Sequence, residues 1–222
     1  MSGYNLILLK EMLEELEEDK VKEILSSFSC PLNSDVESFL RDKAIEFEKQ
    51  SYSSTYLIST SYKQEEQLAG YFTISQKQFT ISSKRSRRRP HVSPISKTQI
   101  KKIAKYGTYD KITDVHTIPA PLIGQLSKNF ACGDGKRGLI SGDELLKIAC
   151  DKVWEIQRLF SGRIVYLECE EESKLIDFYT SNGFVEFGTR SLDPDEKDDL
   201  SGDFLVQMLK DLKANYERNR NV

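Results

Sequence analysis

The stretch Leu175–Phe184, LIDFYTSNGF, has the pattern of a helix that ends and gives way to a strand. Leu175, Ile176 and Tyr179 are three to four residues apart, so they share one face of a helix. Gly183 follows and ends the helix, because glycine adopts the left-handed conformation without steric penalty. A tyrosine one turn before such a break either packs on a sheet or presents its hydroxyl to a cleft. The stretch by itself leaves both interpretations open.

Outward from this stretch, seven segments have the apolar, β-branched or aromatic composition of strands. Two of them flank a polar connection and predict an antiparallel hairpin. The segment that reads APLIGQLSKNF is apolar almost throughout, as expected of a strand covered on both faces. In chain order the seven segments are 4–12, 54–60, 68–82, 120–130, 163–170, 183–189 and 203–212. They predict a mixed sheet.

Helical periodicity separates these strands and is strongest over 143–160. Further helices are predicted over 13–28 and 33–50, and a short one stops at Gly107. Capping boxes, in which a serine is followed three residues later by Glu or Gln, are predicted at Ser34/Glu37, Ser96/Gln99 and Ser141/Glu144. We therefore predict one α/β (α+β) domain over 1–222, with a basic loop and short helix inserted at about 83–107 and a flexible tail at 213–222.

Composition excludes several classes of protein. The 222 residues are 38% hydrophobic and 30% charged, as in ordinary globular proteins, and no apolar run is long enough to span a bilayer. The N-terminus lacks a basic segment followed by an apolar one, so we expect no secretory signal and a cytoplasmic location. The four cysteines form no CxxC pair, and with two histidines they predict neither a disulfide framework nor a metal site: Cys30, Cys132, Cys150 and Cys169.

Charge is divided unevenly along the chain. Between Gln67 and Tyr109 there is no Asp or Glu but there are ten Lys or Arg, so the whole-chain net charge of −3 leaves −13 on the rest. A cationic loop on an acidic body is typical of proteins with a polyanionic partner, although a solvated loop has the same composition. The candidate residues for a polyanionic substrate are Lys84, Arg85, Arg87, Arg88 and Arg89.

The loop RGLISG, 137–142, precedes the long helix and could bind an anion. The first-turn N–H groups of a helix have no intrahelical partners and carry partial positive charge, which favours phosphate or diphosphate. Gly138 and Gly142 would allow an anion close to the backbone, and Arg137 adds a charged donor. Most helix starts of this composition are only capped helices, so the loop alone is a weak signal.

The order of these elements and motifs resembles the GNAT superfamily of acyl-CoA-dependent N-acetyltransferases, over about 4–212. RGLISG is similar to its [RQ]xxGx[GA] diphosphate motif, with Ile140 where a glycine is usual, and FYTSNGF is similar to its FYxxxGF ending. The segments LAGYFTIS, LIGQLSKN and YLECEEESKLIDFYTSNGF complete the resemblance. It implies a largely antiparallel, twisted sheet of about seven strands, helices on both faces, and a splay between the fourth and fifth strands.

The resemblance also implies how acetyl-CoA, the cosubstrate, would bind without a metal. Its pantetheine arm would pair with the fourth strand at Leu126, Ser127 and Lys128. Its diphosphate would lie on Arg137, Gly138, Ile140, Ser141 and Gly142. Its thioester would lie beside Tyr179, the candidate general acid for a departing thiolate.

Glu168 is the candidate base, since it would share a strand face with Ile164 and Tyr166. The acids Glu170–Glu172 cluster at the next turn, where carboxylates usually complement a helix dipole, and Glu172 stands near a position where the superfamily often has asparagine.

A narrower resemblance concerns DVESFLRDKAIEFEKQSYSSTYLI, GYFTIS and APLIGQL, which are similar to segments of the acetyltransferase toxins of bacterial toxin–antitoxin pairs. It implies aminoacyl-tRNA as the acceptor. Many members of the GNAT superfamily dimerise, so that wider resemblance implies a homodimer. The α-amino group of that acceptor, with a pKa near ~8, is partly neutral at pH 7 and needs little help from a base. Protein or small-molecule amines remain alternative acceptors, and a non-catalytic acyl-CoA-binding or RNA-binding module remains an alternative function.

Overall fold

The computed structural model describes residues 3–82, 95–131, 138–194, 196, 200 and 202–213. The chain forms two compact units. Unit 1 comprises Met1–Ser75 and Ile123–Asp151, and unit 2 comprises Gln76–Leu122 and Lys152–Val222. The prediction of a single domain over 1–222 stays a prediction. The basic loop 83–94 and the tail residues 214–222 lie outside the described residues.

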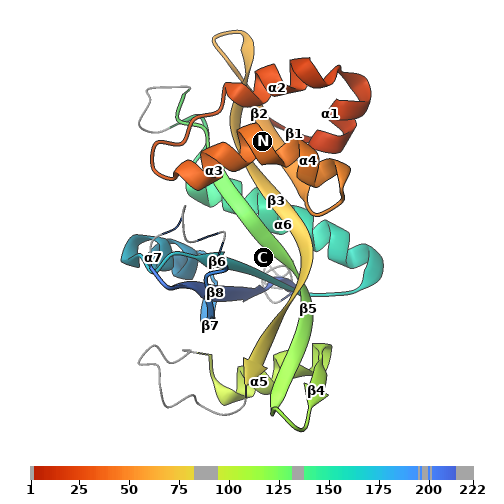
Figure 1. The fold of residues 1–222 in the computed structure, drawn as a ribbon, viewed down its shortest axis with the longest axis vertical. Helices are drawn as coiled ribbons and strands as arrows, with labels where there is room; N and C mark the ends of the chain where they lie inside the picture. Colours follow the sequence, from red (N-terminus) through yellow and green to blue (C-terminus); the bar gives the residue numbers. More distant parts are fainter. Residues whose placement is uncertain are drawn as a thin grey trace, which may run out of the picture. The chain divides into compact units, whose positions relative to one another are not determined.

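In the described part of the chain, eight strands form one sheet of order β1-β2-β3-β5-β6-β8-β7, with β4 paired to β5 outside that path (Figure 1). The pairs β1–β2, β2–β3, β4–β5, β6–β8 and β7–β8 are antiparallel. The strands are β1 (Tyr4–Leu8), β2 (Ser54–Tyr62), β3 (Glu65–Ser82), β4 (Thr108–Asp110), β5 (Val115–Lys128), β6 (Ile164–Cys169), β7 (Val185–Ser191) and β8 (Phe204–Asp211). The predicted mixed, largely antiparallel α/β sheet is confirmed.

The predicted number of about seven strands misses β4, because that strand has only three residues and lies between Gly107 and the turn after Asp110. The predicted hairpin is confirmed and is tighter than its polar connection indicated. Tyr62 pairs with Glu65, and only Lys63 and Gln64 form the turn. Both turn residues have positive φ, 52° and 70°, as a two-residue turn that matches the twist of its strands requires.

Five helical segments of unit 1 lie in the N-terminal fifty residues: α1 (Leu9–Glu15), α2 (Glu18–Ser26), α3 (Ser34–Ser38), η1 (Phe39–Lys43) and α4 (Ala44–Lys49). The predicted capping box at Ser34 is wrong. Asn33 caps α3 instead, and its side chain accepts a hydrogen bond from Val36 N at 3.1 Å. Glu37 turns away from the helix start, where it accepts from Cys30 N at 2.6 Å and pairs with Arg41.

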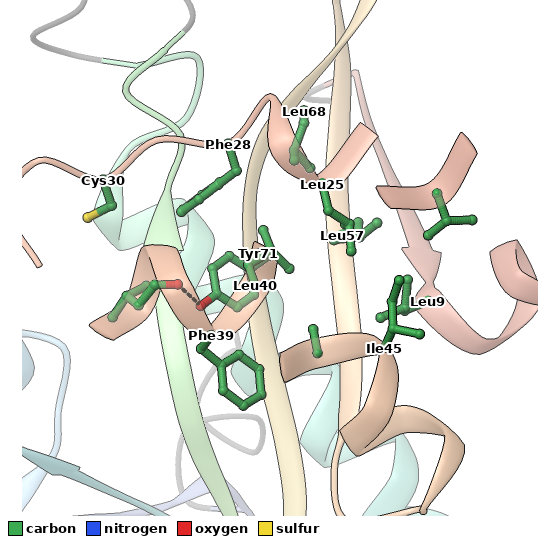
Figure 2. Close-up of a cluster of buried hydrophobic side chains, with 13 residues drawn as sticks. Leu9, Leu25, Phe28, Cys30, Phe39, Leu40, Ile45, Leu57, Leu68 and Tyr71 are labelled. Carbon is green, nitrogen blue, oxygen red and sulfur yellow. Dashed lines mark hydrogen bonds between the residues drawn. The ribbon is translucent and has the colours of Figure 1, made fainter. Parts of the chain in front are cut away.

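These helices pack their apolar faces on β2 and β3 (Figure 2). Leu25, Phe28 and Leu40 are fully buried against Leu57 and Tyr71. Tyr71 also donates a 2.6 Å hydrogen bond from its hydroxyl to Val36 O, and so fixes α3 where the helix widens into the π-helical turn η1. Burial of a cluster of this size is the main stabilising contribution to unit 1.

Unit 2 has its own core, which anchors the inserted helix α5 (Lys97–Ile103) and η2 (Ala104–Tyr106). Both hydrogen bonds of the predicted Ser96/Gln99 capping box are present, and Gly107 ends η2. Ile103 and Ile118 are buried with the aromatic rings of Phe79, Tyr166 and Phe187. The ring centroids of Phe79 and Phe187 are 4.6 Å apart.

Two further helices carry the sequence motifs. The predicted long helix is α6 (Gly142–Phe160), and α7 (Ser173–Ser181) is the helix of the FYTSNGF stretch. Gly162, with φ 139°, and Gly183, with φ 83°, follow the ends of α6 and α7, respectively. Gly183 has the left-handed conformation that the sequence pattern predicts for glycine at a helix end, whereas after α6 Ser161, with φ 78°, adopts it and Gly162 follows.

Candidate active site

The residues predicted to bind a cosubstrate lie at the end of β5 and the start of α6, both in unit 1. Leu126, Ser127 and Lys128 are the last three residues of β5 and are partly exposed. Gly138, Ile140 and Ser141 directly precede α6, which begins at Gly142. Arg137 lies outside the described residues.

The start of α6 is held by the predicted capping box. Ser141 Oγ accepts from Glu144 N at 3.2 Å, and Glu144 Oε2 accepts from Ser141 N at 3.2 Å and from Ser141 Oγ at 2.8 Å. Tyr4 of β1 donates from its hydroxyl to Leu139 O at 3.1 Å. Burial, and then the Glu144 carboxylate, raise the pKa of Tyr4 above its ordinary value. The turn before α6 is therefore fixed both to its own helix and to β1.

Position 138 requires glycine for two reasons. Its φ is 67°, which strains any other residue, and a Cβ there would lie 2.9 Å from Asn129 O. The loop therefore passes directly over the end of β5. An anion bound at this turn would meet backbone groups rather than side chains, as the diphosphate assignment requires.

Asn129, directly after β5, joins the end of that strand to the rest of unit 1. Its side chain is fully buried; Oδ1 accepts from Ser29 N at 2.9 Å and Ala131 N at 3.0 Å, and Nδ2 donates to Leu68 O at 2.9 Å. Its backbone N–H donates to Ala69 O at 2.8 Å. These bonds satisfy a buried amide and hold the end of β5 rigid.

Gly70 on β3 allows the close approach of β5. A Cβ at Gly70 would lie 2.9 Å from Ser127 O and 3.6 Å from Ile140 Cγ2. Ile140 is 2% exposed. The isoleucine that replaces the usual glycine of the motif is therefore buried beside Gly70.

Two carboxylates belong to the first turn of α6, Asp143 and Glu144. Carboxylates there stabilise the helix, but they repel a phosphate at the same N–H groups. The Glu144 carboxylate is engaged by Ser141. Asp143 adds a second negative charge, which a diphosphate bound at this turn would have to tolerate.

Tyr179 lies in the last turn of α7, in unit 2. Its ring is partly buried and makes edge contacts with Phe178 and Phe184, at centroid distances of 5.0 and 5.9 Å. Burial, with a smaller effect of Cys169, raises the pKa of Tyr179 above its ordinary value near ~10. Within the described residues, no hydrogen bond engages the Tyr179 hydroxyl. Packing thus fixes the ring and leaves the phenol protonated at neutral pH.

Glu168, the candidate base, lies on β6 with both carboxylate oxygens engaged. Arg190 Nε donates to Oε2 at 2.7 Å, and Gln207 Nε2 donates to Oε1 at 2.8 Å. Arg190 also donates to Glu196 through Nη1 at 2.8 Å and Nη2 at 2.7 Å. Because both carboxylate oxygens of Glu168 already accept from protein donors, these contacts favour a structural role.

The predicted substrate residues of the basic loop lie outside the described residues. Lys84, Arg85, Arg87, Arg88 and Arg89 belong to the segment 83–94, which is outside the described ranges. Among the described residues, no group of three or more His, Cys, Asp or Glu could hold a metal ion. In that same part of the chain, no helix is long and apolar enough to cross a membrane.

Comparison with solved structures decides the fold. A tyrosine-to-phenylalanine variant of KacT matches with a TM-score of 0.60 over 97% of this chain and 99% of that one, at 16% identity. AtaT complexed with acetyl-methionyl-tRNAfMet matches with a TM-score of 0.58 over 96% and 97%, at 18% identity. AtaTR bound with acetyl-CoA matches with a TM-score of 0.51 over 96% of each chain, at 15% identity. The chain has the GNAT fold. No protein-family model and no curated protein matches the sequence.

In this GNAT fold the strand that the resemblance numbers fourth is β5, and the fifth is β6, because β4 is an additional short strand. The splay between the two stays a prediction. Sequence analysis missed Asn129 and Gly70, which fix the end of β5. No local pattern identifies them, since the Asn129 partners Ser29, Leu68 and Ala69 are 60 or more residues away in sequence, and Ser127, against which Gly70 packs, is 57 residues away.

Proposed function

We propose that the protein is an acetyl-CoA-dependent N-acetyltransferase that transfers an acetyl group to a primary amine, with aminoacyl-tRNA as the acceptor. One observation carries the assignment. Tyr179, at the place the FYxxxGF motif predicts, has a packed ring and a hydroxyl without a partner among the described residues. In a chain with the GNAT fold, such a phenol suits a hydrogen-bond donor to the leaving sulfur.

Acetyl-CoA supplies an activated acetyl group, and the chain supplies position and hydrogen bonds. The amine nitrogen forms the new C–N bond, the C–S bond breaks, and the electron pair of that bond stays on sulfur. Because the pKa of Tyr179 is raised and that of a thiol is near ~8.5, the phenol contributes mainly a hydrogen bond to the developing thiolate. The nitrogen loses one proton, and the sulfur gains one, so coenzyme A is released as a thiol and the reaction balances.

The residues at the end of β5 and the start of α6 fit the other parts of acetyl-CoA. The backbone of Leu126–Lys128 would pair with the pantetheine amides, as in β-strand addition. The turn Gly138–Gly142, with its glycine at positive φ, would receive the diphosphate. Arg137 would add a charge-assisted hydrogen bond.

Aminoacyl-tRNA is the acceptor that suits a site whose candidate base is already engaged. The carboxylate of Glu168, held by two donors, fits an amine that is already partly neutral, such as an α-amino group with a pKa near ~8. A lysine side chain, with a pKa near ~10.4, would need a stronger base. AtaT, which shares the fold, has been solved in complex with acetyl-methionyl-tRNAfMet, and this supports the same class of acceptor.

The test is acetyl transfer to defined pools. The full chain is incubated with acetyl-CoA and either total aminoacylated tRNA or a mixed peptide pool, and mass spectrometry measures acetylated products. We expect acetylated aminoacyl-tRNA and little acetylated peptide. Acetylation of peptides alone would keep the enzyme class and overturn the acceptor. The absence of product in both pools, with acetyl-CoA bound, would overturn catalysis.

One observation favours a second candidate, a non-catalytic acyl-CoA-binding or RNA-binding module. The first turn of α6 carries Asp143 as well as Glu144, and Ile140 fills the position of a usual motif glycine. Both features would weaken a diphosphate site while leaving the fold intact. Calorimetric titration with acetyl-CoA, run beside the transfer assay, separates the two functions.

A further inference from the structure

We propose that the face formed by α5, η2 and β4 binds RNA. We call this surface the α5 face, and its residues are Lys97, Lys101, Lys102, Lys105, Tyr106 and Tyr109. All of them belong to unit 2 and to the described residues. The inference rests on the proposed function, in which RNA carries the acceptor amine, and it names where this chain would hold that RNA.

The lysines of the α5 face are exposed and repel one another. Lys97, Lys101 and Lys105 are spaced i, i+4, i+8, so they lie on one side of the helical segment, and Lys102 is beside them. None of these lysines has an ion pair with any described residue. Like charges at this spacing destabilise a helix, and a polyanion would relieve the repulsion.

The helix that carries these lysines is firmly anchored. Its opposite side buries Ile103, which is 7% exposed, in the unit 2 core with Ile118 and Phe79. The Ser96/Gln99 capping box fixes its start. The lysines are therefore presented from a fixed element, so binding need not order the backbone beneath them.

Two exposed tyrosines distinguish this face from a merely basic one. Tyr109 is 48% exposed, although one face of its ring lies against His116 at 4.7 Å and its hydroxyl donates to Asp114 at 2.8 Å. Tyr106 is 46% exposed and lies 5.9 Å from the Arg163 guanidinium, whose other contacts hold Asp211. Half-exposed aromatic rings on a surface that also carries lysines are the arrangement on which unpaired bases stack.

RNA fits this face better than an acidic protein does. Lysines alone would suit either partner, but fixed and still exposed rings add a stacking surface that suits nucleobases and that the carboxylates of an acidic protein would not use. The acids next to the face are engaged within their own turn: Asp110 accepts from Ile112 N and Thr113 Oγ1, and Asp114 accepts from Tyr109.

The test measures binding without any acetyl transfer. Fluorescence anisotropy measures binding of a labelled, mixed-sequence single-stranded RNA of about 20 nucleotides. The RNA carries no amino acid, and no acetyl-CoA is present. The lysine variant combines Lys101→Gln, Lys102→Gln and Lys105→Gln, and the ring variant is Tyr109→Ala. A control of equal charge change combines Lys10→Gln, Lys20→Gln and Lys43→Gln, which are exposed lysines of unit 1. The segment 83–94 is unchanged in every variant.

We expect the lysine variant to lose at least about tenfold in affinity and to lower the slope of log K against log salt by about 2, as three lost phosphate contacts on a single strand predict. The ring variant should lose roughly tenfold with the slope unchanged. The control should bind within about twofold of the wild-type chain, and circular dichroism verifies that each variant is folded.

Wild-type affinity in the lysine variant would overturn the proposal, even if aminoacyl-tRNA is acetylated. An equal loss in the control would also overturn it, because the effect would then be general charge. Binding of a polyglutamate peptide as tightly as RNA, with no effect of Tyr109→Ala on either, would assign the face to an acidic protein instead. RNA binding through the face in a chain that transfers no acetyl group would keep this proposal and overturn the proposed function.

Discussion

Arg190 of β7 reaches across β8 to hold the carboxylate of Glu168 on β6, with Nε and Oε2 2.7 Å apart. Gln207, the direct cross-strand partner of Glu168, holds the second oxygen at 2.8 Å. The same guanidinium binds Glu196 and keeps the pKa of that carboxyl below its ordinary value. The three strands are thus joined by one polar network, and the residue that sequence analysis proposes as a base belongs to it.

Replacing Glu168 should affect stability more than catalysis. Glu168→Gln should keep the acetyl-transfer kcat within about threefold, because its oxygens are already engaged by Arg190 and Gln207. Glu168→Ala should lower the free energy of unfolding by about 2 kcal/mol, since a partly buried guanidinium and amide lose their acceptor. Urea denaturation and steady-state kinetics measure both. A fall of about 10² or more in kcat for folded Glu168→Gln would restore Glu168 as the base.

Glu48 should make stability depend on pH. The residue is 7% exposed; its carboxylate accepts from Thr55 N at 2.7 Å and has a pKa raised by burial. The folded chain therefore binds this proton more tightly than the unfolded chain. The resulting stability is fully present below the unfolded pKa near ~4.3 and is lost as pH rises through the folded pKa.

Glu48→Gln keeps an acceptor for Thr55 N and removes the charge, so its melting temperature should exceed that of the wild-type chain at pH 7 by roughly 3 °C and match it near pH 4. Glu48→Ala, which leaves Thr55 N unsatisfied, should be less stable at both pH values by about 1–3 kcal/mol. Calorimetry across this range measures the difference. A wild-type chain that is more stable than Glu48→Gln at pH 7 would contradict the assignment.

Local sequence patterns predicted the parts of the fold that depend on local chemistry. The Ser96 and Ser141 boxes, the hairpin and the glycine after α7 are settled by residues within a few positions of one another. The Ser34 box failed because Glu37 finds Cys30 N and Arg41, which leaves Asn33 as the better cap. Local pattern could not distinguish these outcomes.

The candidate site was predicted only as far as its motifs reach. Gly138 and Tyr179 belong to short motifs, and the family resemblance implied their roles, whereas the close approach of β5 to β3 depends on Gly70 and the rigidity of the β5 end depends on Asn129. The engaged state of Glu168 depends on Arg190 and Gln207 from two other strands. Such long-range partners decide whether a carboxylate is a base or a structural ion, and no single stretch of sequence contains them.

Gly138→Ala should weaken acetyl-CoA binding through the backbone. The φ of 67° and the 2.9 Å approach of a Cβ to Asn129 O would displace the turn before α6. We expect about tenfold weaker binding by calorimetry and a loss of about 1–2 kcal/mol in stability. Gly202→Ala is the control, because its φ of 92° gives comparable strain with no atom within 4 Å of the Cβ. Equal acetyl-CoA affinity in the two variants would remove Gly138 from the cosubstrate site.

Asp143→Asn should improve acetyl-CoA binding about two- to fivefold, because it removes a negative charge from the first turn of α6 without removing the Ser141 cap. The gain should shrink at high salt. Asp151→Asn, further along the same helix, makes the same change in charge away from the proposed diphosphate site and should leave the affinity unchanged. A gain of the same size in both variants would mean that only net charge matters.

The central claim is that Tyr179 assists departure of coenzyme A during acetyl transfer, and Tyr179→Phe tests it most directly. Release of free thiol is followed with acetyl-CoA and aminoacyl-tRNA for the wild-type chain, Tyr179→Phe and the control Tyr52→Phe, an exposed tyrosine of unit 1. We predict a kcat reduced about 10²-fold for Tyr179→Phe, with unchanged acetyl-CoA affinity and a wild-type rate for the control. A Tyr179→Phe variant that turns over at the wild-type rate would contradict the account.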